Sequence, residues 1–158
     1  ALDTVISQCE LQHSDKVKGT LLLIQAPGTP TLIRGTISGL EPGEHGFHIH
    51  KTGDLREGCS SLCAHYNPFN KQHGGRLMKE RHVGDLGNIK PNDKGEVKIS
   101  FLDSLLRLRG ETSIIGRSVV IHEDRDDLGL GGNEESKITG NAGKRIACGV
   151  IGYSKDCP

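Results

Sequence analysis

The sequence predicts an all-β protein in which short antiparallel strands form a sandwich or barrel. Two observations support this: apolar residues alternate with polar ones in several short segments, and turn sequences separate those segments. Aromatic residues make up only 3% of the chain and tryptophan is absent, so Val, Ile and Leu must build the core. The length of 158 residues predicts a single domain, 1–158.

The expected strands follow one another along the chain. Residues 31–38 and 96–101 alternate apolar and polar side chains, and the run 26–30, Ala-Pro-Gly-Thr-Pro, is typical of a hairpin connection. Residues 102–109 could be read as a helix, but the alternation in 106–109 fits a strand better. Further strands are expected at 5–11, 17–25, 118–122 and 147–151, and further turns at 13–16, 41–44 and 92–95.

Two long segments, 51–83 and 123–144, show no strand pattern. Loops longer than about 15 residues are uncommon in compact domains and are usually functional or disordered. The first segment holds three histidines, so bound metal could hold it in place of a core. The second is charged and rich in glycine, which by itself would suggest a solvated loop.

Composition excludes several classes of protein. The chain has 20 basic and 20 acidic residues, so no basic excess indicates nucleic-acid binding. No apolar run approaches the roughly 20 residues of a membrane span, and no membrane partner is expected. The five cysteines form no C-x-x-C motif, which argues against a zinc ribbon or a thioredoxin-type site, and spacing alone does not choose their pairing.

Histidines carry the strongest functional signal. On a strand, His48 and His50 would point to the same face and could hold one metal, while His82 and Asp85 are close enough for a tight turn to bring both onto one ion. Six imidazoles and one aspartate are too many for one tetrahedral site, and they suit two sites that share a ligand. The six are His48, His50, His65, His73, His82 and His122.

Five motifs together resemble the copper/zinc superoxide dismutases. They are Gly46-Phe47-His48-Ile49-His50, Gly74-Gly75, Arg81-His82-Val83-Gly84-Asp85-Leu86-Gly87-Asn88, Ile115-Gly116-Arg117-Ser118-Val119-Val120-Ile121-His122-Glu123 and Gly140-Asn141-Ala142-Gly143-Lys144-Arg145-Ile146-Ala147-Cys148-Gly149-Val150-Ile151-Gly152. The likeness covers about residues 5–152. It implies an eight-stranded antiparallel Greek-key β-barrel, related to the immunoglobulin-like sandwich, with a metal-binding loop at 51–83 and an electrostatic loop at 123–144.

The resemblance implies an antioxidant enzyme that dismutes superoxide to oxygen and hydrogen peroxide by copper redox cycling. One copper and one zinc ion would bind per chain, with zinc structural because it has no redox chemistry. The copper ligands would be His48, His50, His65 and His122. The zinc ligands would be His65, His73, His82 and Asp85. His65 would bridge the two ions and could hand a proton to the second superoxide.

The same match assigns residues around the copper. Arg145 would offer a permanently charged fork of donors to superoxide, and Thr139 would form the opposite wall of the channel. Asp126 would accept hydrogen bonds from one copper histidine and one zinc histidine, fixing both rings. Charged residues of the channel would be Glu134, Glu135 and Lys137.

Several positions depart from the family pattern. Lys137 lies one place before the usual lysine, Ile138 takes that slot, and Asp124 stands where a lysine is frequent. Weaker electrostatic steering of superoxide is therefore expected. Thr52 replaces an aromatic residue of the usual dimer interface, although a homodimer is still expected.

The resemblance also pairs two cysteines. Cys59 and Cys148 match the family's intrasubunit disulfide, worth roughly 4–5 kcal/mol in the chain-entropy model. A second bond between Cys63 and Cys157 could run alongside it or join two subunits, which would leave Cys9 as a buried free thiol. Such a second bond favours a secreted protein slightly over a cytoplasmic one. A copper chaperone is a further expected partner.

Three other functions compete with this reading. A copper-delivery domain of the same fold would be expected to lack copper ligands or the arginine, but all seven ligands and Arg145 are present. A zinc-only storage protein would bind metal without turnover, and only the altered loop charges favour it. A zinc hydrolase fits poorly, because no glutamate lies at general-base spacing beside a histidine pair.

Overall fold

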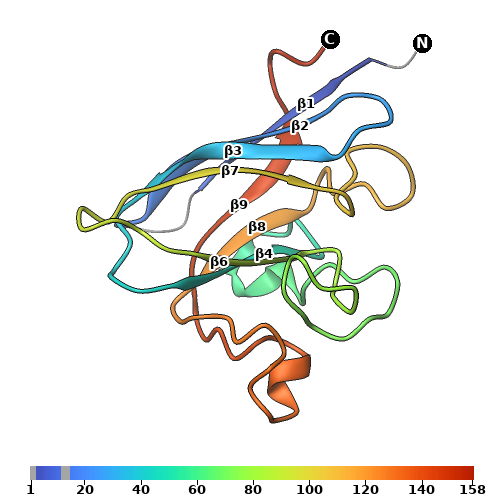
Figure 1. Ribbon diagram of the computed structural model, residues 1–158. Helices are drawn as coiled ribbons and strands as arrows, with labels where there is room; N and C mark the ends of the chain where they lie inside the picture. The colour runs from blue at the N-terminus through green and yellow to red at the C-terminus, as the bar shows by residue number, and fades with distance from the viewer. Residues whose placement is uncertain (1–2, 12–14) are drawn as a thin grey trace.

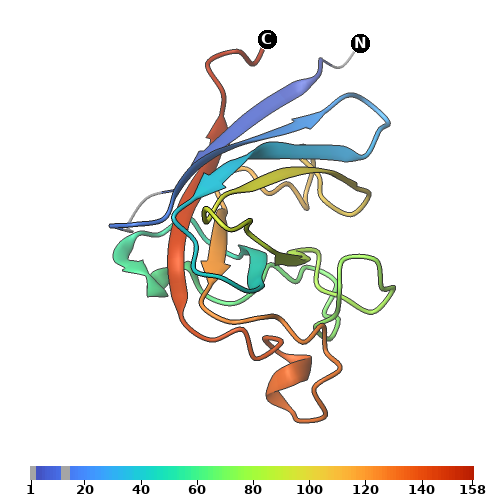
Figure 2. The same ribbon diagram turned by 60° about the vertical axis from the view of Figure 1, so that its left-hand side comes forward.

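A computed structural model describes residues 3–11 and 15–158 and shows strands wound into a nearly closed barrel (Figures 1 and 2). Eight strands form one antiparallel sheet in the order β6-β4-β8-β9-β1-β2-β3-β7. The strands are β1 (Val5–Glu10), β2 (Lys18–Gln25), β3 (Thr31–Ser38), β4 (His45–His50), β5 (Arg56–Cys59), β6 (Asp85–Ile89), β7 (Val97–Asp103), β8 (Ser118–His122) and β9 (Arg145–Tyr153). The short β5 lies outside this sheet. The predicted all-β barrel is confirmed.

The hairpin between β2 and β3 forms where turn residues were predicted. Thr29 N donates to the Ala26 carbonyl at 3.2 Å, and Gly28 adopts a φ of 72°, which favours glycine. The register pairs Ile24 with Leu32 and continues down both strands. The turn predicted at 13–16 lies partly outside the described residues.

The barrel interior is filled by aliphatic side chains and Phe47, as the low aromatic content predicted. Strand β4 is buried at all six positions, because Phe47 and Ile49 face this core while His48 and His50 face the opposite side. Strand β8, also buried throughout, pairs with β4 through His48 and Val120. The two strands thus form a rigid wall whose outer face can carry metal ligands.

The strand predicted at 106–109 is wrong, although the alternation behind it is real. Leu106 and Leu108 are fully buried under the barrel end, and the intervening Arg107 is exposed. Their backbone groups bond outside any ladder, since Thr31 Oγ1 donates to the Leu106 carbonyl at 2.8 Å and Leu108 N donates to Gln25 Oε1 at 2.8 Å. Period-two burial therefore arises here in a loop that crosses the end of the barrel.

Two short strands, β5 and β6, were not predicted, and β5 lies within the segment read as loop. The remainder of 51–83 is largely irregular and is tied to the barrel at specific points. Tyr66 N donates to the Ile49 carbonyl at 2.8 Å, and the buried Arg81 pairs with Asp103 of β7 at 2.8 Å. The helical elements, η1 (Ser60–Leu62) and η2 (Glu135–Lys137), are three residues each, and none in the described ranges could span a membrane.

Candidate metal centre

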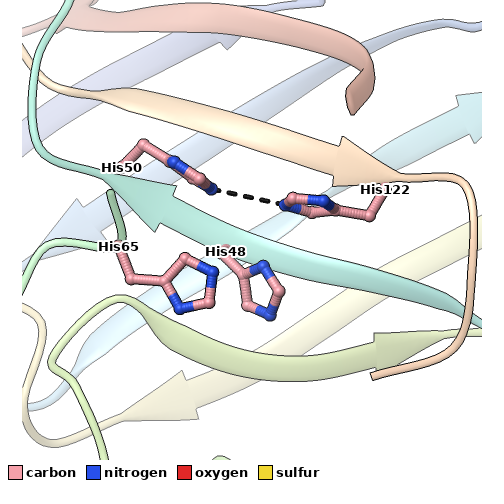
Figure 3. Close-up of side chains that lie close together, drawn as sticks. All are labelled: His48, His50, His65 and His122. Atoms are coloured by element: carbon pink, nitrogen blue, oxygen red, sulfur yellow. Dashed lines mark hydrogen bonds between the residues drawn. The ribbon is translucent and has the colours of Figure 1, made fainter. Parts of the chain in front are cut away.

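The first cluster joins four buried histidines from three parts of the chain. His48 and His50 come from β4, His122 from the end of β8, and His65 from the loop between β5 and β6 (Figure 3). One ring nitrogen from each lies within 4.8 Å of the others. A bulge between Ile121 and His122 in the pairing with β9 turns the β8 histidine toward the group. These are the four residues assigned to copper from the sequence.

Backbone carbonyls select the nitrogen that each outer histidine presents. His50 Nδ1 lies 2.7 Å from the Cys63 carbonyl, and His122 Nδ1 lies 2.9 Å from the Gly143 carbonyl. Each Nδ1 must then carry the proton, which leaves a lone pair on Nε2. The two Nε2 atoms lie 3.3 Å apart and face one another, an arrangement suited to binding one cation.

The second cluster converges on a single carboxylate oxygen. The Nδ1 atoms of His65, His73 and His82 lie 2.9, 2.9 and 3.1 Å from Asp85 Oδ1. Asp85 is held by its other oxygen, which accepts from the backbone nitrogens of Gly74 at 3.0 Å and His82 at 2.8 Å. Three imidazoles and one carboxylate around a common point match the donor set of tetrahedral zinc.

His48 also lies within reach of this second cluster. Its Nε2, however, bonds Asp126 Oδ2 at 2.6 Å, and its Nδ1 is buried without a partner among the described residues. His73 Nδ1 lies 2.9 Å from Asp85 Oδ1 but makes no hydrogen bond of good geometry within that part of the chain. Buried imidazole nitrogens seldom stay unpaired, so both atoms are accounted for if metal ions bind them. His82 is the better fourth member of the zinc cluster.

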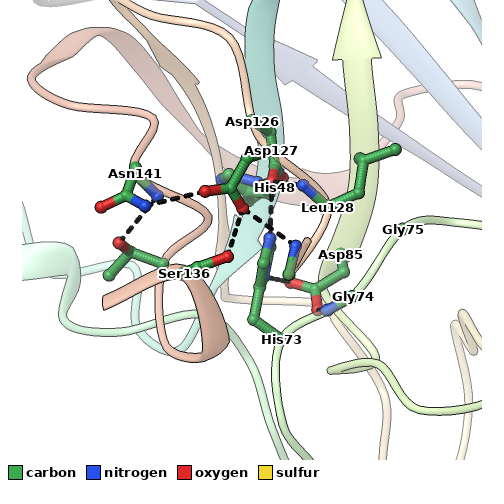
Figure 4. A network of polar contacts seen from close by, with 12 residues as sticks. His48, His73, Gly74, Gly75, Asp85, Asp126, Asp127, Leu128, Ser136 and Asn141 are labelled. Carbon is green, nitrogen blue, oxygen red and sulfur yellow. Dashed lines mark hydrogen bonds and ion pairs between the residues drawn. The ribbon is translucent and has the colours of Figure 1, made fainter. Parts of the chain in front are cut away.

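Asp126 joins the two clusters (Figure 4). Its Oδ2 bonds His48 Nε2 at 2.6 Å, and its Oδ1 bonds His73 Nε2 at 2.7 Å. The backbone around Asp126 is fixed by Asn88, whose Oδ1 accepts from Asp126 N at 2.7 Å and whose Nδ2 donates to its carbonyl at 2.9 Å. Asp126 therefore lies between the two clusters, and the contacts of Asn88 with it were not predicted.

Gly140 leaves room for this bridge. A Cβ there would lie 2.0 Å from Asp126 Oδ1 and 2.5 Å from His73 Nε2, and its φ of 72° also favours glycine. A larger residue at 140 would displace the carboxylate that orients both histidines. The glycine-rich sequence of 123–144 thus serves close packing at this point.

Charge differs between the two clusters. Burial lowers the pKa of His48, His50 and His65, and it lowers that of His122 to about 4. Burial also opposes charge on His73, but the close carboxylates of Asp126 and Asp85 outweigh burial and raise its pKa to about 9. The first cluster is therefore a set of neutral imidazoles, and the second cluster is organised by carboxylates.

Known proteins match this chain along most of its length. A family model described as copper/zinc superoxide dismutase matches residues 17–151. A superoxide dismutase [Cu-Zn] of Paramecium bursaria Chlorella virus 1 is 57% identical over 141 residues, which cover 89% of this chain and 75% of that protein. The chain belongs to the copper/zinc superoxide dismutase family. It is an oxidoreductase that converts superoxide to oxygen and hydrogen peroxide with copper and zinc as cofactors.

A cavity of about 320 Å³ opens onto the first cluster, as expected for a dismutase. Arg145 lines it and is half-buried, with Nη1 donating to the Cys59 carbonyl at 2.8 Å and Nη2 to the Cys63 carbonyl at 2.6 Å. Thr139 also lines it, as predicted. The full lining is His50, Ala64, His65, His122, Glu135, Ile138, Thr139, Asn141, Ala142, Gly143 and Arg145.

Two of the predicted channel residues do not line this cavity. Glu134 and Lys137 line a separate groove beside His82. The cause is the 3₁₀ turn η2, in which residues three apart share a face. Glu135 therefore lines the cavity, whereas Ile138, at the C-cap of η2, lines both the cavity and the groove, so an apolar side chain takes the place of the expected cation.

The predicted disulfide between Cys59 and Cys148 is present, with Cα atoms 5.9 Å apart across 89 residues of chain. The second bond is not formed within the chain, because Cys63 and Cys157 are free thiols. Cys63 follows η1, where its carbonyl bonds His50 of the first cluster, whereas Cys157 lies beside β1, where Ile6 N donates to its sulfur at 3.5 Å. A bond between subunits through these cysteines stays a prediction, and so does the slight preference for secretion that rests on a second bond.

Sequence reasoning missed the backbone acceptors of the site. The Cys63 carbonyl accepts hydrogen bonds from both His50 and Arg145. Cys63 itself adopts a φ of 68°, which is uncommon for a residue with a side chain. Backbone carbonyls leave no signature in residue type, so motif spacing could not have found them. Cys9 is the buried free thiol that the sequence predicted, and burial raises its pKa to about 12.

Proposed function

We propose residue roles for superoxide dismutation, carried by one observation: Asp126 holds one histidine of each cluster on its two carboxylate oxygens. Copper would be held by His48 Nδ1, His50 Nε2, His122 Nε2 and His65. Zinc would be held by the Nδ1 atoms of His65, His73 and His82 together with Asp85 Oδ1. When bound, copper supplies one-electron redox chemistry and zinc supplies a fixed positive charge.

His65 is the proposed shared ligand and proton carrier. Its Nδ1 is directed at Asp85, so its second ring nitrogen points toward the other histidines of the copper cluster (Figure 3). The His65 ring centroid lies 4.0 Å from that of His48 and 4.9 Å from that of His50. A proton on His65 Nε2 would therefore lie at the floor of the cavity, where the second superoxide can accept it.

Arg145 is the proposed anion-binding group. The Cys59 and Cys63 carbonyls use one hydrogen on each terminal nitrogen and fix the guanidinium plane at the cavity wall. A planar fork of donors that is always charged suits a small anion. Thr139 stands in the same lining, where its hydroxyl donates to Glu135 Oε1 at 2.9 Å and so limits the attraction of Glu135 for cations.

The test is superoxide decay, followed optically after pulse generation, with one copper and one zinc loaded per chain. Dismutases of this kind are among the enzymes that approach the diffusional ceiling of about 10⁸–10⁹ M⁻¹s⁻¹. Arg145→Gln should slow decay by about tenfold or more. Arg125→Gln is the matched control, since it removes an equal charge from an exposed residue outside the cavity lining. Equal rates for both variants would refute the role of Arg145.

We also propose a homodimer formed through three adjoining segments. Gly53 packs so closely on Gly116 that a Cβ would lie 2.3 Å from its carbonyl oxygen, and Gly116 N donates to the Ile151 carbonyl at 2.8 Å. Thr52 Oγ1 donates to the Ser61 carbonyl at 2.9 Å, so the hydroxyl is satisfied within the chain and does not oppose contact with a partner. Sedimentation at micromolar concentration should show a dimer, and a monomer would overturn this.

A copper chaperone is proposed as a partner on family grounds alone.

A further inference from the structure

A second cavity, of about 380 Å³, lies at the other end of the barrel from the electrostatic loop. It is an open pocket lined by the β2–β3 hairpin and by the loop that follows β7; these two segments are seen in blue and gold at the right of Figure 1. None of the metal-cluster residues lines it. We call it the hairpin cavity, and its lining is Gln25, Ala26, Pro27, Gly28, Thr29, Pro30, Ser104, Arg107 and Arg109.

Two arginines give the hairpin cavity a positive charge. Neither Arg107 nor Arg109 pairs with a carboxylate among residues 3–11 and 15–158. Arg109 Nη2 donates to the Asp3 carbonyl, but its Nη1 is buried and has no hydrogen-bond partner in the same ranges. A buried donor on a charged group is costly to leave unpaired, so an anionic acceptor would be stabilised here.

An apolar row crosses the outer face of the sheet beside the hairpin cavity. Its members are direct cross-strand partners: Ile6 pairs with Ile24, Ile24 with Leu32, and Leu32 with Leu102. The outward face of such a sheet normally carries polar side chains, and Leu102 is 59% exposed. Four apolar residues in register form a continuous strip rather than scattered surface leucines.

The apolar row and the hairpin cavity adjoin. Gln25 of the cavity directly follows Ile24, Pro30 precedes Leu32 by two residues, and Ser104 follows Leu102 by two. The neighbouring row on the other side is more polar, since Leu22 there pairs with Gln8 and Arg34. The two arginines thus lie along the strand ends that border the strip: Arg107 Nη1 donates to the Ser104 carbonyl just after β7, and Arg109 Nη2 donates to the Asp3 carbonyl just before β1.

We propose that the hairpin cavity and the apolar row bind a single-chain amphiphilic anion, such as a long-chain fatty carboxylate. Arg107 and Arg109 take the head group, for which a guanidinium is geometrically suited. The alkyl chain lies along Leu102, Leu32 and Ile24, where it removes apolar surface from water. A small inorganic anion would leave the row uncovered, and a neutral hydrocarbon would leave the guanidinium groups unpaired.

The experiment is calorimetric titration of the metal-loaded protein with laurate below its micelle concentration, because the absence of tryptophan removes the usual fluorescence signal. One laurate should bind per chain, and affinity should rise by about twofold or more for each added CH₂ between octanoate and laurate. Arg107→Gln should weaken binding by about tenfold. Lys94→Gln, an equal loss of charge in an exposed turn between β6 and β7, should leave it unchanged.

Leu102→Ser tests the apolar row separately, since it should make the affinity depend less on the length of the fatty-acid chain. Acetate should stay a poor ligand for every variant. The proposal is overturned if acetate binds as tightly as laurate, or if only vesicles of phosphatidylcholine and phosphatidylglycerol bind. It is also overturned if Arg145→Gln abolishes laurate binding while Arg107→Gln does not, because the carboxylate would then sit in the copper cavity. Superoxide decay measured with and without laurate should be equal, so this test is independent of the proposed dismutase residues.

Discussion

The copper and zinc halves of the centre share His65 but are built from different parts of the fold. Three of the proposed copper ligands lie on β4 and β8, strands that are buried at every position. The histidines of the proposed zinc half come from the loop between β5 and β6. Their Nδ1 atoms surround one oxygen of Asp85. Strand hydrogen bonds and core packing can hold the first half in place without metal. The second half brings several polar and charged groups together in a loop that buries few apolar side chains, so it has less to hold it in place.

This contrast teaches why one ion is structural. Removing a cation from the copper half leaves neutral imidazoles whose outer nitrogens still bond Cys63, Gly143 and Asp126. Removing it from the zinc half leaves the Nδ1 atoms of three rings crowded against a single oxygen of Asp85. The loop that carries the zinc ligands should therefore depend on its ion far more than the strands do.

The largest expected effect is that of zinc removal. Selective loss of zinc should lower the melting temperature by roughly 10 °C, because a tightly bound ion stabilises the folded state by several kcal/mol. Loss of copper alone should cost clearly less. Differential scanning calorimetry of the two partly loaded forms, with hydrogen exchange of residues 65–82, measures the difference. Equal shifts for the two ions would break the contrast.

Asp126→Asn should come next. Loss of the carboxylate that orients His48 and His73 should weaken zinc affinity by about 10–100-fold, the usual effect of such outer partners. The matched control is Asp127→Asn, because Asp127 bonds Ser136 at 2.7 Å and Asn141 at 2.7 Å but no histidine. Competition with a chelator of known affinity measures both variants, and similar losses in the two would show that the loop matters rather than the bridge.

The metal-free protein should lose stability in opposite pH directions through the two halves. Burial holds the folded pKa of His122 at about 4, below the ordinary 6.5, so its stabilising contribution is complete above pH 6.5 and is lost as pH falls toward 4. The pKa of His73 is raised to about 9, so its contribution is complete below pH 6.5 and is lost as pH rises through 9.

The free energy of unfolding of the metal-free protein should thus be greatest near pH 6.5. Urea unfolding measured between about pH 4 and pH 9 tests this. His73→Gln should remove the alkaline loss and leave the acid loss in place. A variant that changes both limbs equally would contradict the assignment of one limb to each half.

The smallest expected effect concerns the cavity mouth. Ile138→Lys should raise the rate of superoxide decay by about twofold to threefold at low salt, because it restores a cation on the copper-facing side of η2. Lys137→Gln should change the rate less, since Lys137 lines the groove beside His82. Rates measured against ionic strength decide this, and a larger effect of Lys137→Gln would show that the groove guides superoxide.

Much of this structure could be predicted from sequence, for identifiable reasons. Alternation located β3 and an apolar run located β8 to the residue, and family motifs indicated the residues that gather in the two clusters and the Cys59–Cys148 bond. Sequence failed where backbone geometry decides the outcome. The buried alternation at 106–109 belongs to a loop, and the 3₁₀ turn at η2 sends Lys137 away from the copper cavity.

The central claim is that His65 belongs to both halves. A crystal structure of the metal-loaded protein, with anomalous scattering collected at the copper and zinc edges, tests it most directly. The account predicts a copper peak among His48, His50 and His122, a zinc peak beside Asp85, and the His65 ring between them. Two peaks with His65 contacting only one ion, or both metals within one cluster, would contradict it.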